Sequence, residues 1–171
     1  MAVYSGIGYV TSIVYLFLQG VGDGSQPLIS RYYGEKNTAV MNRIRLFAHK
    51  TGLSITLVCA ALLFLARGNI GILFGASAES NQGIISYLPL FLAAMPLVSF
   101  IRITTSYLYA TEKVGYSYIL VYAEPIILLL FLSTIPLWFG LPGVWAAVPL
   151  SQLIAFAAAV LIKYRMDYKA A

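Results

Sequence analysis

The stretch LQGVGDGSQPLISRYYGEK, residues 18–36, places a carboxylate at the end of a long apolar run. Asp23 stands between two glycines, and a Gln-Pro pair follows at residues 26–27. A plain membrane anchor has no use for such a residue, because a charge near the bilayer centre costs about 2.5–3.5 kcal/mol on insertion scales. The stretch therefore predicts a membrane helix with a polar site in the protein interior.

The composition indicates an integral membrane protein. The 171 residues are 60% hydrophobic and only 10% charged, whereas soluble proteins contain about 25% charged residues. The net charge of +5 comes from Lys and Arg that are gathered in a few loops. In a membrane protein this clustering marks the topology, so we do not expect nucleic acid as a partner. The single cysteine, Cys59, leaves no intramolecular disulfide.

Apolar windows predict an all-α, polytopic membrane helix bundle of about five transmembrane helices. A spanning helix needs roughly 20 mostly apolar residues. The predicted spans are residues 4–30, 51–66, 84–109, 118–139 and 144–162. Between the first two, Val40, Ile44 and Phe47 predict a short amphipathic helix at the headgroup level, with His49 solvated beside it. Residues 70–74 are expected to form an interfacial piece.

The basic residues orient these spans. Cytoplasmic loops collect Lys and Arg, and residues 31–50 hold five of them, while Lys163, Arg165 and Lys169 follow the last span. We therefore expect a multi-pass protein of the plasma membrane with its N-terminus outside and its C-terminus in the cytoplasm. An odd number of spans that begins outside also predicts that at least one earlier span is missing.

Three ionisable residues fall inside the spans: Asp23, Arg102 and Glu124. Counted from the inner end of each span at 1.5 Å per residue, all three lie about 9–12 Å deep. We expect them to face the bundle interior, with Arg102 paired to Glu124 or Asp23 and the less well paired acid free to meet a cation or proton. Asp23 is the acid that we favour for this role.

Small and helix-breaking residues surround both acids. Gly20 and Gly24 form a small-xxx-small pair that admits a neighbouring helix. Pro27 and Pro125 each remove a backbone donor. A broken helix beside a carboxylate is typical of transporter substrate and ion sites, although tight packing with a fixed kink is the alternative. The remaining candidates are Gln26 for binding and Gly22 for the helix break.

Enzyme function has no support in the sequence. No catalytic triad, zinc-ligand spacing or nucleotide-binding loop is present, and GVGDGS lacks the glycine register and the preceding strand of a phosphate loop. We therefore expect no enzyme activity, no metal site and no cofactor.

An ordered set of motifs resembles the multidrug and toxic compound extrusion (MATE) transporters. The motifs are GVGDGSQPLISRYYGEKN, RITTSYLYATEK and EPIILLLFLSTIPLWFGLPGVWAAVPLSQ. The resemblance covers the whole chain, residues 1–171, and implies part of the carboxyl-terminal lobe of a two-lobe transporter, namely helices eight to twelve. The amino-terminal lobe of the same protein is then the missing partner.

The resemblance implies a secondary antiporter that exports amphipathic, often cationic drugs or toxins in exchange for Na+ or H+. In one branch of that family an acid on the tenth helix helps to bind the cation, whereas residues 84–109 contain no Asp or Glu. The coupling ion, its stoichiometry and the substrate therefore stay open. The alternatives are a lipid-linked saccharide flippase of the same superfamily and an inactive, truncated membrane assembly partner.

Overall fold

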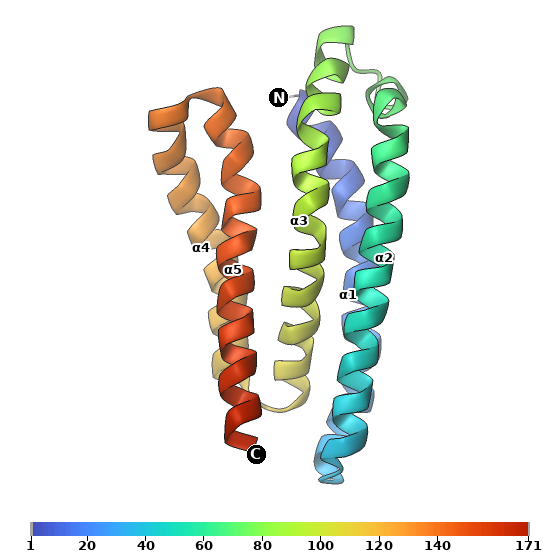
Figure 1. Cartoon of the computed structure of the whole chain (residues 1–171), viewed down its shortest axis with the longest axis vertical. Helices are drawn as coiled ribbons and strands as arrows, with labels where there is room; N and C mark the ends of the chain where they lie inside the picture. Colours follow the sequence, from blue (N-terminus) through green and yellow to red (C-terminus); the bar gives the residue numbers. More distant parts are fainter. Residues whose placement is uncertain (1, 171) are drawn as a thin grey trace.

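Five long helices account for nearly all of the chain (Figure 1). The computed structural model describes residues 2–170 and the side chains of residues 3–166. Within this part the helices are α1 (Ala2–Gly34), α2 (Thr38–Leu73), α3 (Ala78–Ala110), α4 (Val114–Phe139) and α5 (Leu141–Ala170). All five are long and apolar enough to cross a membrane. The predicted all-α membrane bundle is confirmed.

The helices extend beyond the predicted spans, most of all in α2. The predicted amphipathic helix around residues 40–47 is its first part, and residues 70–73 are its last turn. Both were wrongly predicted to be separate elements: once a helix is nucleated, each further residue adds a hydrogen bond, and no proline interrupts α2. On this helix Val40, Ile44 and Phe47 share a face, of which Val40 and Ile44 are half-buried while Phe47 is 71% exposed.

Short polar turns end the helices. The side-chain oxygen of Asn37 accepts a hydrogen bond from the amide of Val40 at 3.2 Å and caps the start of α2. Ser77 caps α3 in the same way through the amide of Ser80 at 3.3 Å. Gly140 separates α4 from α5 with a φ of 59°, a left-handed conformation that glycine adopts without strain.

The third helix is the centre of the bundle. α3 packs against each of the other four helices, whereas within the described residues α1 does not pack on α4 and α2 does not pack on α5. In Figure 1, α2 and α5 lie in front of α3, and α1 and α4 lie behind it. A groove lies on each side of α3, one between α1 and α4 and one between α2 and α5, and each holds a pocket.

The two ends of the bundle differ in which connections they hold. The N-terminus lies at the same end as the α2–α3 and α4–α5 connections. The C-terminus lies at the opposite end, with the α1–α2 and α3–α4 connections. The Lys- and Arg-rich segments of the sequence therefore meet at the C-terminal end of the bundle.

Candidate functional site

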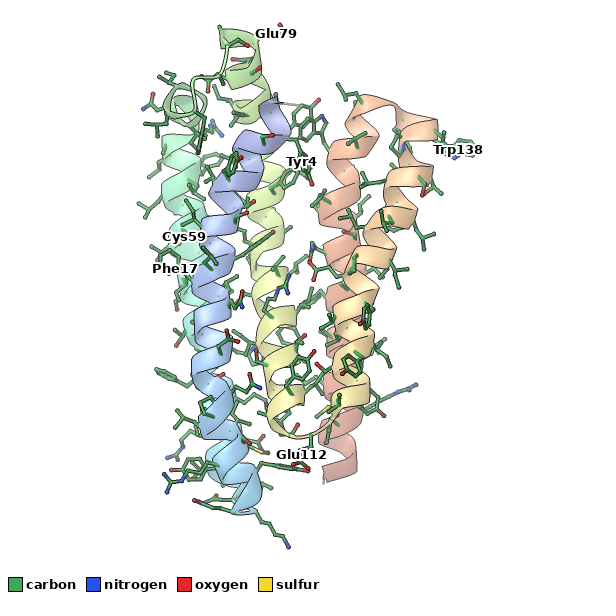
Figure 2. The ribbon with its side chains drawn as sticks, turned by 180° about the vertical axis from the view of Figure 1, so that it is seen from behind. Tyr4, Phe17, Cys59, Glu79, Glu112 and Trp138 are labelled. Atoms are coloured by element: carbon green, nitrogen blue, oxygen red, sulfur yellow. The ribbon has the colours of Figure 1, made fainter. Side chains whose placement is uncertain are left out.

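A polar pocket of about 510 Å³ lies in the groove between α1 and α4. Figure 2 shows the bundle from this side, with α1 and α4 on either side of α3. Helix α1 and helix α3 supply nearly all of the lining, and these residues are Tyr15, Gln19, Asp23, Gln26, Arg102, Thr105, Ser106, Tyr109 and Val121. The pocket therefore gathers two of the three ionisable residues predicted inside the spans, Asp23 and Arg102, together with two glutamines.

Arg102, Glu124 and a glutamine from α5 form a connected polar network beside the pocket. The guanidinium of Arg102 lies 3.5 Å from Oε2 of Glu124. The side-chain amide of Gln152 donates a hydrogen bond to Oε1 of Glu124 at 2.8 Å. Both carboxylate oxygens of Glu124 therefore have partners, and the network ties α3, α4 and α5 together. The predicted pairing of Arg102 with Glu124 is present.

Asp23 lies in the same pocket as Arg102 but is less well held. Its side chain makes no ion pair or hydrogen bond with the residues whose side chains the structure describes. It is exposed in this chain, while the side chain of Glu124 is only 19% exposed. Of the two acids, Asp23 is thus the one available to a solute in the pocket.

The helix break predicted near Asp23 is absent. α1 is one continuous helix from Ala2 to Gly34 with Pro27 inside it, and α4 likewise continues through Pro125. A proline removes a single hydrogen bond of the ladder, and the surrounding bonds hold the helix together. Pro27 still has no N–H to donate to the carbonyl of Asp23, four residues earlier, so a backbone acceptor lies next to the carboxylate.

The close helix contact is at Gly22, not at the Gly20–Gly24 pair. A Cβ added at Gly22 would lie 2.6 Å from the hydroxyl of Ser106 on α3, whereas Gly20 and Gly24 face open space. The serine hydroxyl next to this contact, Ser25 Oγ, donates to the carbonyl of Gly22 at 2.8 Å. Within the described residues, Gly22 therefore makes the close contact with α3, and no helix lies against Gly20 or Gly24.

Sequence reasoning missed Gln152, Gln19 and Tyr15. Gln152 is a buried amide in the mostly apolar stretch of residues 144–162, and such a residue signals a polar partner inside the bundle. Gln19, Asp23 and Gln26 are spaced by four and three residues, which places them on one helix face. That periodicity was a usable signal for the pocket lining.

Comparison with known proteins identifies the fold. The MatE family model matches residues 1–135. A crystal structure of MATE in complex with MaL6 has a TM-score of 0.88 and 21% identity, and the match covers 99% of this chain and 39% of that chain. An outward-facing conformation of a multidrug resistance MATE family transporter of the MOP superfamily has a TM-score of 0.89 and 22% identity, covering 99% and 38%.

An inward-facing conformation of a multidrug resistance MATE family transporter of the MOP superfamily has a TM-score of 0.87 and 21% identity, and the match covers 98% of this chain and 39% of that chain. At such identities the likeness shows the fold alone. The chain spans about two-fifths of the length of each structure. Among curated proteins, no sequence matches it significantly.

Proposed function

Because the chain belongs to the MatE family, we propose that it forms helices eight to twelve of a secondary antiporter. The antiporter exports amphipathic, often cationic compounds in exchange for Na+ or H+. The observation that carries this proposal is Asp23, an acid without an ion-pair partner among the described side chains, in a polar pocket of a membrane bundle. Ionisable residues inside membrane bundles mark ion and substrate pathways.

The two acids have different roles in this proposal. Glu124 is held by Arg102 and Gln152, and this network stabilises the packing of α3, α4 and α5. Asp23 is the acid that binds the coupling ion or proton, next to its own backbone carbonyl and to Gln26 in the same pocket. Carboxylate, carbonyl and amide oxygens suit a hard cation such as Na+, and the carboxylate alone suits a proton.

The pocket also suits an amphipathic cation. Tyr15 and Tyr109 add aromatic rings to the lining, and aromatic faces attract cations. Arg102, whose guanidinium lies against Glu124, is the single basic residue of the lining. A flippase for anionic lipids calls for more basic residues than this, so drug export is the better supported of the two activities.

Export also requires the rest of the transporter. Antiporters alternate access by moving two repeats against each other around a central site. The five helices fit an outward-facing and an inward-facing relative almost equally, with TM-scores of 0.89 and 0.87, which supports movement of this part as a rigid unit. The open face at Gly20 and Gly24 is where we place contact with the missing amino-terminal lobe.

The Lys and Arg distribution supports the membrane orientation. The segments rich in these residues meet at the C-terminal end of the bundle, so we propose that this end is cytoplasmic and that the N-terminus of this chain is outside. The plasma membrane is the location that export requires.

The test is an export assay with the complete transporter. We expect Asp23→Asn to reduce export of a cationic dye at least tenfold while the folded yield stays at the wild-type level. We expect Glu124→Gln and Arg102→Ala to lower the folded yield, since each leaves the network incomplete. Glu79→Gln, an acid in the first turn of α3 outside the pocket, is the matched control.

Two outcomes would contradict the assignment. Export by Asp23→Asn at the wild-type rate would remove Asp23 from the mechanism. Loss of folded protein in that variant would make Asp23 a structural residue. Imposed Na+ and pH gradients, applied separately to proteoliposomes, identify the coupling ion.

A further inference from the structure

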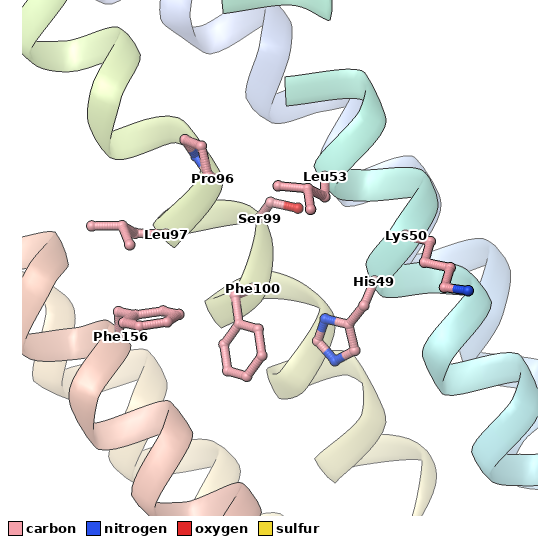
Figure 3. A pocket seen from close by; sticks show the side chains of 8 residues that line it. All are labelled: His49, Lys50, Leu53, Pro96, Leu97, Ser99, Phe100 and Phe156. Atoms are coloured by element: carbon pink, nitrogen blue, oxygen red, sulfur yellow. The ribbon is translucent and has the colours of Figure 1, made fainter. Parts of the chain in front are cut away.

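A second groove lies on the other side of α3, between α2 and α5. It holds a pocket of about 300 Å³, and Figure 3 shows its side chains, with Leu53 on α2, Pro96, Leu97 and Phe100 on α3, and Phe156 on α5. Phe100 and Phe156 contact edge to face, with ring centres 5.0 Å apart. The groove is thus a ready-made apolar channel on a face of the bundle that no described helix covers.

A histidine contributes to the lining of this channel. The ring of His49 stacks on Phe100 with centres 4.8 Å apart, so the side chain is half-buried rather than solvated as the sequence predicted. His49 also lines a second, narrower pocket together with Arg45, Thr104 and Lys163. The apolar channel and the basic pocket therefore lie next to each other and share the side chain of His49.

Two polar atoms in the basic pocket lack partners. Nε2 of His49 and the hydroxyl of Thr104 are buried without a hydrogen bond to the described residues. Buried polar groups are satisfied in the great majority of native structures, so a pair of orphans in one pocket calls for an external group. Both can donate a hydrogen bond, and an acceptor with several oxygens satisfies both at once.

The charge around the pocket selects an anion. Segments 43–50 and 163–169 carry six basic residues and one acid, Asp167, and none of the described residues that line the two pockets is acidic. The guanidinium of Arg45 is held over the ring of Tyr107, 4.6 Å from its centre. The side chains that line the pocket leave no room for a phosphate between them. An anion therefore binds at the mouth, and the side chains of His49 and Thr104 must turn toward it to donate, as side chains commonly do on binding.

The position of the pocket matches a membrane interface. The apolar run of α2 begins after Lys50, and that of α5 ends before Lys163. Arg45 and Lys163 thus lie at headgroup level, while Leu53, Leu97 and Phe156 lie toward the hydrocarbon. Basic pockets between transmembrane helices at this depth bind anionic lipid headgroups.

We propose that the groove between α2 and α5 binds one anionic phospholipid. Its phosphate accepts hydrogen bonds from His49 and Thr104 and pairs with Arg45 and Lys163, and one acyl chain lies along Leu53, Leu97 and Phe156. The apolar channel distinguishes a lipid from a free phosphate, which has nothing to place there. The site is separate from the polar pocket on the other side of α3 and does not depend on the proposed antiport.

The test is native mass spectrometry of the complete polypeptide that contains this chain, with phosphatidylglycerol and phosphatidylcholine compared as bound lipids. We expect phosphatidylglycerol to be retained preferentially. We expect Lys163→Gln and Arg45→Gln each to weaken its retention about fivefold, the factor that corresponds to one basic residue near a membrane surface. The control Arg43→Gln removes a charge from the same segment outside both pockets and should change retention less than twofold.

A second arm tests the acyl channel without changing charge. Leu53→Trp fills the channel from an exposed position and should reduce retention of phosphatidylglycerol while the melting temperature in detergent stays unchanged. Equal retention of the two lipids, an equal loss in Arg43→Gln, or full displacement by millimolar inorganic phosphate would each overturn the proposal. Inorganic phosphate that binds Leu53→Trp as well as wild type, with no lipid preference, would identify a simple anion site instead.

Discussion

Helix α3 lines both grooves, but the two grooves differ in polarity. The groove between α1 and α4 presents Asp23, Gln26 and Arg102, whereas the groove between α2 and α5 presents Leu53, Leu97 and Phe156. One helix therefore serves a polar site on one side and an apolar channel on the other. The difference shows that two faces of one membrane helix can differ in polarity: the lining is polar and charged on one side and mostly apolar on the other.

Cysteine labelling tests which leaflet each end of the two grooves faces. We expect an all-or-none result in a Cys59→Ser background: Ser80→Cys labels from outside only, and Asn37→Cys labels only after permeabilisation. The reason is the concentration of Lys and Arg at the Asn37 end. Labelling of the 80 position from the cytoplasm would reverse the orientation and place the basic pocket in the outer leaflet.

Helix α3 packs closely against α2 at Gly52, on the apolar side of the bundle. A Cβ added at Gly52 on α2 would lie 2.5 Å from both Ser99 Oγ and Ile103 Cδ1 on α3. We expect Gly52→Leu to destabilise the protein by about 3 kcal/mol, the upper end of the range for overpacking. Gly68→Leu, on the same helix but facing open space, is the control. Equal unfolding midpoints for the two variants would refute the close contact.

On the polar side of α3, the corresponding close contact is at Gly22, which faces one side chain of α3 where Gly52 faces two. Gly22 meets only the Ser106 side chain and, more distantly, the carbonyl of Arg102. We expect Gly22→Leu to destabilise by about 2 kcal/mol, and Ser106→Gly to restore part of that loss. A penalty at Gly22 larger than the one at Gly52 would show that the polar side is the more tightly packed.

Variants of Arg102 and Glu124 test how much their ion pair stabilises the contact between α3 and α4. Removing one partner of a fully buried pair costs about 3–5 kcal/mol, but the side chain of Arg102 is 47% exposed. We therefore expect Arg102→Gln to destabilise by about 1–2 kcal/mol. The double variant with Glu124→Gln should recover most of this loss. Additive effects in unfolding experiments would mean that the two charges are not coupled.

The number, type and order of the helices could be predicted from the sequence, because five long apolar runs, each near the length that a membrane span needs, outweigh the local preferences of single residues. The polar layer could also be predicted, since counting residues from the ends of three spans brought Arg102 to Glu124. Both predictions rest on rules that need no partner: the length of a span and the depth of a charge.

Features that depend on a neighbouring element could not be placed from one helix alone. Gly20 and Gly24 have the spacing of a packing motif and face open space in this chain, while Gly22 makes the contact with α3, because the rotation of a helix about its axis is set by its neighbours. His49 was expected in water, but Phe100, 51 residues later in the sequence, covers its ring. The predicted helix break at Pro27 is absent, because neighbouring helices and backbone groups tolerate a single missing hydrogen bond.

His49 gives the smallest expected effect and the sharpest contrast between the two grooves. In His49→Phe, the new ring keeps the stack on Phe100 and removes a buried nitrogen without a hydrogen bond to the described residues. Removing an unsatisfied polar atom is nearly neutral or stabilising. In detergent without anionic lipid, we therefore expect the variant to melt within about 0.5 kcal/mol of wild type or slightly above it.

Addition of phosphatidylglycerol should separate the two proteins. The wild type gains stability because the lipid binds the folded state, while His49→Phe loses one donor to the phosphate and gains less. Dye export should be unchanged, since His49 lies on the other side of α3 from Asp23. A variant that gains as much from the lipid as wild type would show that the histidine is packing alone, and a loss of export would show that the two grooves are coupled through α3.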